Sequence, residues 1–274
     1  MLLALNVNNT NTVIALFPIH NGRVGELRIT WRISTRQSQT ADEYGILVRN
    51  LLQGEGIESK DITGIVIASV VPPIDWTLRQ FCERYFGQKP LFIEPGVKTG
   101  LPIRTDNPAE AGADRIANCV GAFEKYGGPC IVVDFGTATN FDVISAKGEF
   151  IGGAIAPGLN ISAEALFARA ARLPRVEIKR PAKIIGTNTV DNLQIGLFYG
   201  HIGLVDSILE RMIGELGAET VCIATGGLAH LIAGDSKYIT HINDTLTLEG
   251  LRIIYERHCS ARGRAHQDDS AAKA

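Results

Sequence analysis

Two segments of the chain share one order of apolar and polar positions. Leu2–Phe17 and Cys130–Ile144 each contain an apolar run, then Asn6 or Asp134, then a short turn rich in Thr, Asn or Gly, and then a second apolar run. This order predicts a strand, a tight turn and a second strand. The two segments lie nearly half the chain apart, whereas solenoid repeats have periods of about 20–50 residues. The pattern therefore indicates two duplicated domains.

Helical and strand-like patterns alternate along the rest of the chain. Thr40 and Glu43 form a capping-box signature at the start of a predicted helix, and the apolar run Gly64–Val71 predicts a buried strand. Apolar periodicity predicts further helices, and a short apolar run predicts a further strand. The helices are expected over residues 76–86, 112–126, 159–171 and 191–216 and around residues 248–255, and the strand over residues 221–225.

The alternation of elements predicts an α/β fold with two similar halves. We expect an N-terminal domain over residues 1–117 and a C-terminal domain over residues 118–260. Residues 261–274 lack apolar periodicity and are expected to form a disordered tail.

Composition narrows the class of protein. Hydrophobic residues make up 45% and charged residues 20% of the 274 residues, which is typical of a soluble globular protein with a substantial core. The net charge of −2 does not favour a nucleic-acid partner, and no run approaches the roughly 20 apolar residues that cross a membrane. The five cysteines are scattered without a C-x-x-C pair, which favours a reduced, cytoplasmic protein over a disulfide framework or a zinc site.

Three short polar turns are candidates for binding phosphate. They lie at Asn6–Thr12, Asp134–Thr139 and Thr225–Gly227. Small residues in such turns allow backbone N–H groups to approach a phosphate without obstruction. A single turn of this kind is more often purely structural. Three of them, two repeated at half-length, favour a nucleotide site.

A series of motifs in chain order resembles the type III pantothenate kinases, members of the superfamily that contains actin-like ATPases and acetate and sugar kinases. The motifs are NTNT at Asn9–Thr12, WRIST at Trp31–Thr35, TADEY at Thr40–Tyr44, SVVP at Ser69–Pro72, GLPI at Gly100–Ile103, DNP at Asp106–Pro108, GADR at Gly112–Arg115, DFGT at Asp134–Thr137 and TGG at Thr225–Gly227. The most specific part is GADR followed by DFGT. The resemblance runs from residue 1 to about residue 258.

The resemblance implies a fold and an activity. The expected fold consists of duplicated actin-like (ribonuclease H-like) domains with the active site in the cleft between them. The expected activity is ATP-dependent phosphorylation of pantothenate to 4′-phosphopantothenate, the first step of coenzyme A biosynthesis. The family also implies Mg²⁺ with ATP, stimulation by K⁺ or NH₄⁺, and a homodimer.

The same resemblance implies roles for particular residues. Asp114 is the expected proton acceptor, and Asp134 is expected to help bind the monovalent cation. The remaining expected contacts fall into an ATP group and a pantothenate group. ATP is expected at Asn6, Val7, Asn8, Asn9, Thr10, Asn11, Thr12, Val13 and Thr137, and pantothenate at Gly112, Ala113, Asp114, Arg115 and Thr189.

The chemistry of these residues has structural alternatives. Asp114 falls in the first turn of a predicted helix, where the helix dipole favours its ionised form, so it is either a proton acceptor or only a favourable first-turn acid. Arg115 either binds the carboxylate of pantothenate through two hydrogen bonds or pairs with Glu110. Asp134 ends an apolar strand, where a cation or a structural partner satisfies its charge.

Three positions depart from the family pattern. Asn6 and Asn8 stand where Asp and Gly are expected, and Thr105 stands where some members have an aromatic residue. Asn6 lacks the charge that orients hydrated magnesium, whereas Asn8 tolerates the left-handed conformation expected after the replacement of glycine. Asn6 therefore also favours a second hypothesis, a weakened or inactive homologue that binds ATP or pantothenate in a regulatory role. A sugar or acetate-type kinase of the same fold is a third hypothesis, which the GADR motif disfavours.

Overall fold

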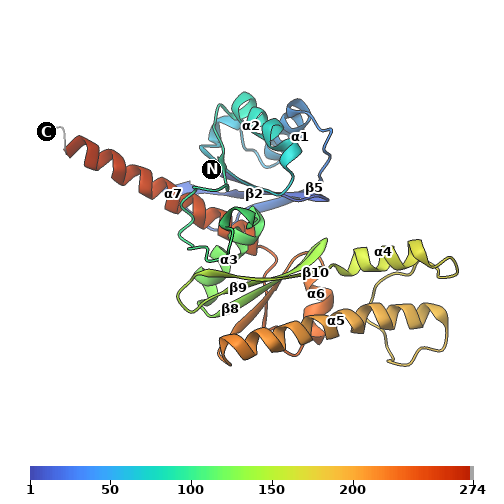
Figure 1. The fold of residues 1–274 in the computed structure, drawn as a ribbon. Helices are drawn as coiled ribbons and strands as arrows, with labels where there is room; N and C mark the ends of the chain where they lie inside the picture. Colours follow the sequence, from blue (N-terminus) through green and yellow to red (C-terminus); the bar gives the residue numbers. More distant parts are fainter. Residues whose placement is uncertain (272–274) are drawn as a thin grey trace. The chain divides into compact units, whose positions relative to one another are not determined.

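A computed structural model describes the backbone of residues 1–271 and the side chains of residues 1–261. The chain forms two compact units (Figure 1). Unit 1 contains Met1–Pro102, Asp106–Gly121 and the segment that begins at Leu246. Unit 2 contains Ile103–Thr105 and Ala122–Thr245. Each unit is built around one five-stranded sheet.

The sheet of unit 1 has the strand order β5-β2-β1-β6-β7. Strands β2 and β5 are antiparallel to their neighbours, whereas β1, β6 and β7 run parallel. The strands are β1 (Leu2–Val7), β2 (Asn11–Phe17), β5 (Ile29–Ser34), β6 (Gly64–Ser69) and β7 (Leu91–Phe92), and a separate ribbon contains β3 (Ile19–His20) and β4 (Arg23–Val24).

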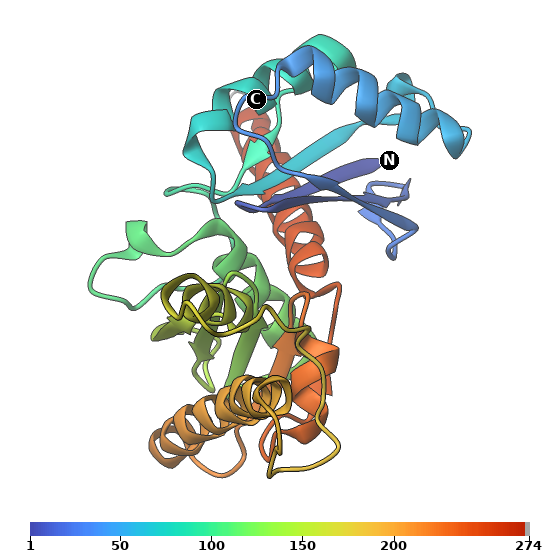
Figure 2. The same ribbon diagram turned by 90° about the vertical axis from the view of Figure 1, so that its right-hand side faces the viewer.

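Helices cover both faces of this sheet, which explains why β1 is apolar along its whole length. Leu3, Leu5 and Val7 pack in one core with helices α1 (Ala41–Gly54) and α2 (Pro72–Phe86). On the opposite face, helix α7 (Leu246–Ala271) packs against β1 and β6, as Figures 1 and 2 show.

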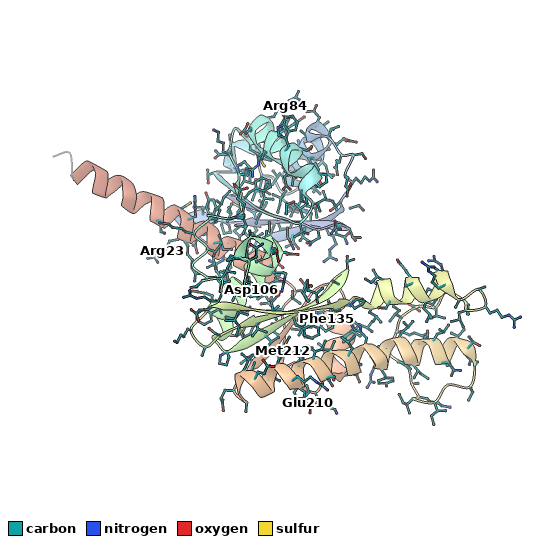
Figure 3. The ribbon with its side chains drawn as sticks, viewed as in Figure 1. Arg23, Arg84, Asp106, Phe135, Glu210 and Met212 are labelled. Carbon is teal, nitrogen blue, oxygen red and sulfur yellow. The ribbon has the colours of Figure 1, made fainter. Side chains whose placement is uncertain are left out.

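The sheet of unit 2 repeats the order and directions of the first as β10-β9-β8-β11-β12. The core on one face joins β8 and β9 to the long helix α5 and contains Phe135, the last residue of β8 (Figure 3). The strands are β8 (Cys130–Phe135), β9 (Ala138–Ile144), β10 (Phe150–Pro157), β11 (Val221–Thr225) and β12 (His241–Ile242), and the helices are α4 (Leu159–Arg169), α5 (Thr189–Leu216) and α6 (Ala229–Ile232). Short 3₁₀ turns at Ser59–Asp61, Pro108–Glu110 and Ala233–Asp235 complete the chain.

The two sheets confirm the predicted duplication and the α/β fold class. Asn6 is the penultimate residue of β1 and pairs with Val13, and Asp134 is the penultimate residue of β8 and pairs with Asn140. The two repeated segments therefore occupy equivalent places in equivalent sheets.

The limits of the units differ from the predicted domain limits in two ways. Helix α7 belongs to unit 1 and not to the predicted C-terminal domain. The first boundary falls within helix α3 (Ala113–Tyr126), after Gly121. A Cβ atom at Gly250 of α7 would lie 1.8 Å from the carbonyl oxygen of Ala117 in α3, so the two helices cross in close contact. The buried Thr247 hydroxyl also donates to Asn118 Oδ1 at 2.6 Å. The periodicity of a helix shows that it has an apolar face, but not which sheet that face covers.

Several element ends follow their local signals. The predicted capping box of α1 is present, because the Glu43 N–H donates to the Thr40 hydroxyl and the Thr40 N–H donates to the Glu43 carboxylate. Helix α2 begins at Pro72 rather than at the predicted Trp76, since proline suits the first helical position. It ends at Phe86, as predicted, and Gly87 follows it in the left-handed conformation.

The predicted disordered tail differs from the structure over part of its length. Helix α7 continues through Ala271, because Ala, Arg and Gln favour helix and no proline interrupts this segment. Residues 272–274 of the predicted tail lie outside the described residues. Among the described residues, no helix has the length and apolar content needed to cross a membrane.

Candidate active site

The first hairpin, β1–β2, ends in the exposed residues Asn9 and Thr10. The Asn8 N–H donates to the Asn11 carbonyl oxygen at 3.0 Å and closes a four-residue turn. The Thr35 N–H donates to the Thr10 carbonyl oxygen at 3.0 Å, so the residue that follows β5 supports the tip of the hairpin. This arrangement places two exposed residues at the tip of a fixed turn, as a phosphate-binding turn requires.

The conformation of Asn8 differs from the expectation. Among the described residues, Asn21 is the one non-glycine residue with a positive φ, so Asn8 does not adopt the left-handed conformation. Four-residue hairpin turns are most often built around a type I turn, which needs no positive φ at this position. The turn therefore does not need a glycine at position 8.

Asn6 lies just before this turn, on the face of β1 opposite the α1–α2 core. Its side chain is 8% exposed, and its Oδ1 atom has no hydrogen-bond partner among the side chains and backbone that the structure describes. Buried polar atoms are normally satisfied, so this acceptor is available to a ligand atom or a water. An amide oxygen suits a hard cation or a water of its hydration shell.

Gly112, Ala113, Asp114 and Arg115 form the start of α3 in unit 1. The Gly112 carbonyl accepts the Ile116 N–H at 3.0 Å, and Asp114 Oδ1 accepts the N–H of Arg115 at 2.8 Å. A Cβ atom at Gly112 would lie 2.8 Å from Asp114 Oδ1, so glycine makes room for this carboxylate. The motif therefore holds the Asp114 side chain in one place.

Burial raises the pKa of Asp114, and the N–H and charge of Arg115 oppose that shift. The sequence-based argument, which used only the helix dipole, pointed to a more acidic group. Loss of solvent outweighs the dipole at this half-buried position. A raised pKa makes the carboxylate a better proton acceptor.

The second hairpin, β8–β9, has the exposed residues Gly136 and Thr137 at its tip. Two glycines of unit 2 pack directly on it. A Cβ atom at Gly226 would lie 2.5 Å from Asp134 Oδ1, and one at Gly158 would lie 2.1 Å from the Thr137 carbonyl oxygen. Gly226 also has φ +92°, which other residues rarely adopt. The predicted turn at Thr225–Gly227 therefore lies against the Asp134–Thr139 turn.

Each hairpin is fixed by a buried threonine at the second residue of its returning strand. In unit 1 the hydroxyl oxygens of Thr12 and Thr35 are 2.8 Å apart. In unit 2, Thr139 Oγ1 lies 3.1 Å from His201 Nε2 of α5, and burial lowers the pKa of His201. The sequence analysis did not identify His201, because its contact with Thr139 connects positions far apart in the chain.

The structure distributes the predicted residues over both units. Unit 1 holds the first hairpin and Gly112–Arg115, and unit 2 holds Asp134, Thr137 and Thr189. Thr189 is exposed at the first position of α5, whose N-cap Asn188 accepts the Asp191 N–H at 2.9 Å. In unit 2 the Thr105 hydroxyl is buried and has no partner among the described residues.

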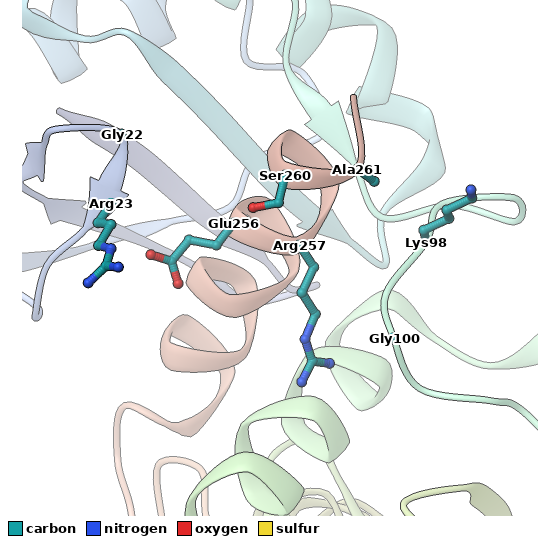
Figure 4. Close-up of a pocket in the computed structure, with 8 residues that line it drawn as sticks. All are labelled: Gly22, Arg23, Lys98, Gly100, Glu256, Arg257, Ser260 and Ala261. Carbon is teal, nitrogen blue, oxygen red and sulfur yellow. The ribbon is translucent and has the colours of Figure 1, made fainter. Parts of the chain in front are cut away.

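A pocket of about 680 Å³ in unit 1 contains none of the predicted site residues (Figure 4). Glu256 in this pocket accepts the Val24 N–H and pairs with Arg252, while Arg257 donates to the Thr99 carbonyl. The Arg257 guanidinium and the Lys98 amine point in different directions in Figure 4. The pocket is lined by Gly22, Arg23, Lys98, Gly100, Glu256, Arg257, Ser260 and Ala261. These contacts join α7 to β4 and to the loop that contains Thr99.

Comparison with solved structures supports the fold. The chain is similar to a conserved putative Baf family transcriptional activator from Campylobacter jejuni, with a TM-score of 0.57 and 18% identity over 94% of this chain and 99% of that one. It is also similar to the ethanolamine utilization protein EutJ from Carboxydothermus hydrogenoformans, with a TM-score of 0.52 and 14% identity over 92% of this chain and 89% of that one. Together with these matches, the duplicated sheets and their equivalent polar hairpins place the chain in the actin-like fold class.

Sequence comparison identifies the family within that class. The family model described as type III pantothenate kinase matches residues 2–211. A type III pantothenate kinase from Acidobacterium capsulatum is 74% identical over 97% of this chain and 98% of the relative. One from Koribacter versatilis is 61% identical over 97% of this chain and 99% of the relative. The chain belongs to the type III pantothenate kinase family, which confirms the resemblance found in its motifs.

Proposed function

We propose that this protein transfers the γ-phosphoryl group of ATP to the primary hydroxyl of pantothenate and so forms 4′-phosphopantothenate, the first step of coenzyme A biosynthesis. The observation that carries the proposal is the Gly112–Arg115 segment. It holds a half-buried carboxylate of raised pKa beside a guanidinium at the start of a helix. Such a pair suits a phosphoryl-acceptor substrate that carries both a hydroxyl, which the carboxylate can deprotonate, and a carboxylate, which the guanidinium can bind.

Asp114 is the proposed proton acceptor. The hydroxyl oxygen of pantothenate attacks the γ-phosphorus, the bond from that phosphorus to the ADP oxygen breaks, and the hydroxyl proton passes to the Asp114 carboxylate. A loose transition state requires mainly orientation and late proton acceptance, which a fixed carboxylate provides. Arg115 binds the pantothenate carboxylate and orients the hydroxyl.

The two hairpins are the proposed phosphate-binding elements. Residues Asn6 to Val13 contact the phosphates through the β1–β2 turn, and Thr137 contacts ATP through the β8–β9 turn. Mg²⁺ bound with ATP supplies charge neutralisation for the phosphates. Among the described residues, no cluster of three or more His, Cys, Asp or Glu side chains is arranged for a metal. The unpartnered Asn6 Oδ1 supports a contact with a water of the hydrated ion, and the Asp134 carboxylate supports a K⁺ or NH₄⁺ site.

A panel of phosphate acceptors tests this function. Release of ADP is measured with pantothenate, pantothenol, a hexose, glycerol and acetate at one ATP concentration. We expect pantothenate to give the highest kcat/KM. A higher value for a hexose or for acetate overturns the choice of substrate. Binding of ATP without phosphorylation of any acceptor supports the second hypothesis, a homologue with a regulatory role. The neutral side chain of Asn6 favours that hypothesis.

We also propose that the protein is a cytoplasmic homodimer in which Thr189 contributes to the partner's pantothenate site. Four of the five cysteines are buried free thiols, in keeping with a reducing compartment. The start of α5 is flanked by exposed apolar side chains, with Ile184 64% and Ile185 78% exposed. Gly200 lies on the exposed side of α5, where another backbone can approach.

Light scattering tests the assembly. We expect twice the monomer mass of 29.6 kDa for the wild type and the monomer mass for Gly200→Arg, which places a long charged side chain on that surface. Gly54→Arg is the matched control, because the structure shows open space at Gly54 on α1 as well. A monomeric wild type at micromolar concentration contradicts the proposed dimer.

A further inference from the structure

The chain between β6 and α2 forms a short turn, Ser69–Val71, which we call the β6–α2 turn. The Ser69 hydroxyl donates to Asp75 Oδ1 at 2.5 Å and accepts the Val71 N–H at 3.2 Å. Asp75 lies in the first turn of α2. One carboxylate therefore holds the turn through a single serine.

This turn touches both candidate binding elements of unit 1. The Val70 N–H donates at 3.0 Å to the carbonyl of Val7, the last residue of β1 before the phosphate hairpin. A Cγ atom of Val70 lies 3.7 Å from the position of a Cβ atom at Gly112. Gly112 in turn abuts the Asp114 carboxylate. Displacement of Val70 would therefore move the phosphate hairpin and the Asp114 segment relative to each other.

The contact of Asp75 with Ser69 is not an ordinary helix cap. The N-cap of α2 is Val71, and among the described residues no side chain caps this helix end. Helix α2 opens with two prolines, which have no N–H, and the Ile74 N–H donates to the Val71 carbonyl at 3.1 Å. The Asp75 carboxylate reaches back to the strand end instead. Burial raises the pKa of Asp75, the Ser69 hydroxyl lowers it, and the charges of Arg79 and Glu94 oppose each other. The hydroxyl of Ser69 is thus the main group that stabilises this carboxylate.

We propose that Asp75 is a positioning residue for phosphoryl transfer. Acting through Ser69, it holds the β6–α2 turn and so sets the distance between the phosphate hairpin and the Asp114 carboxylate. This inference rests on the proposed roles of those two elements. A misplacement of about 1 Å between reacting groups costs up to about 100-fold in rate. Loss of the Asp75–Ser69 contact should therefore lower kcat and leave the binding of both substrates nearly unchanged.

The test compares Ser69→Ala, Asp75→Ala, their double variant and Asp75→Asn in the full chain. We expect the first two to lower kcat by about 10- to 100-fold, with the KM values for ATP and pantothenate within about threefold of wild type. Both changes break the Ser69–Asp75 bond, and Ser69→Ala also removes the acceptor of the Val71 N–H. The double variant is therefore expected to lose no more than the larger single loss. Asp75→Asn keeps an acceptor oxygen for Ser69 and is expected to restore most of the turnover.

The ratio of phosphopantothenate formed to ADP formed separates positioning from general loosening. It is expected to fall in Ser69→Ala and Asp75→Ala, because a displaced acceptor leaves more phosphoryl groups to water. Ser236→Ala is the matched control. Its hydroxyl donates to Asp206 Oδ1 at 2.6 Å in unit 2, so its loss tests an equivalent Ser–Asp bond that touches no candidate site residue. It is expected to lower the melting temperature and leave kcat unchanged.

The outcomes distinguish the positioning role from the proposed function. Wild-type protein that phosphorylates no pantothenate overturns the proposed function, and this inference with it. An active wild type whose Ser69→Ala and Asp75→Ala variants lose only thermal stability overturns the positioning role alone. So does an Asp75→Asn variant that folds normally and is as slow as Asp75→Ala.

Discussion

Replacing Asn6 by Asp adds a negative charge at a buried acceptor that the structure leaves without a partner. The side chains have the same shape, so the change tests charge and not packing. Asn6 Oδ1 lies at the end of β1, 8% of the side chain is exposed, and no described group donates to it. A carboxylate at this place should attract the hydrated magnesium of Mg·ATP more strongly than an amide does. We expect kcat/KM for Mg·ATP to rise by about 10-fold or more, with the KM for pantothenate nearly unchanged.

The same substitution has an expected cost in stability. An unsatisfied buried group costs about 1–3 kcal/mol, and a charged one costs more. Because burial raises the folded-state pKa of the new carboxyl above its unfolded value, the cost is absent at acid pH. It appears as the pH rises through the folded-state pKa. Mg·ATP should offset it, since the ligand binds the folded state.

Steady-state kinetics with varied ATP, and melting temperatures at pH 5 and pH 8 with and without Mg·ATP, measure both effects. Asn21→Asp is the matched control, because it adds the same charge in the exposed β3–β4 turn of unit 1. An Asn6→Asp variant with no gain in kcat/KM for Mg·ATP, together with a wild type of full activity, would refute the reasoning. Asn6 would then support the hairpin and not the metal.

Three further substitutions test the site. Asp114→Asn should lower kcat by about 10²–10⁴-fold with pantothenate binding near normal; turnover within about threefold of wild type would contradict the role. The same variant should be more stable than wild type at neutral pH, because the raised pKa of Asp114 means that its ionised form loses stability as pH rises through the folded-state pKa. Arg115→Ala should weaken pantothenate binding by about 1.5–3 kcal/mol and leave pantothenol little affected, whereas equal losses in calorimetry would make Arg115 structural. Gly226→Ala should reduce the free energy of unfolding by about 1–3 kcal/mol, because its Cβ would meet Asp134 Oδ1; in urea titrations Gly214→Ala, at an open helical position, should not reduce it.

Both polar hairpins could be predicted from the sequence because their signals are local. An apolar run, a short polar turn and a second apolar run determine a hairpin wherever they occur, and the half-length repeat then predicts two sheets. The Thr40–Glu43 capping box and the stop at Gly87 are local in the same sense. The fold class and the placement of Asp114 in a first helical turn followed from these signals.

The sequence analysis did not predict strands β10 and β5. In β10 the reason is that a residue of the strand is determined by its contact with the neighbouring strand. Strand β10 contains Gly152 and Gly153, which read as a break in the sequence. A Cβ atom at Gly153 would lie 1.7 Å from the Phe141 carbonyl oxygen, so the neighbouring strand requires that glycine. Strand β5 is a different case, because it alternates half-buried and exposed residues, a local strand signal that the sequence analysis used only as part of the WRIST motif.

The sequence by itself determined the repeated hairpins, the order of the long helices, and the family, because each depends on neighbouring residues or on motifs in chain order. Only the tertiary structure decided which sheet α7 covers, that Asn6 Oδ1 lacks a partner, that burial raises the pKa of Asp114, and that Asp75 holds Ser69. Solvent exclusion and hydrogen bonding depend on every group that surrounds an atom in the folded chain. Most of those groups come from distant positions, where no local pattern specifies them.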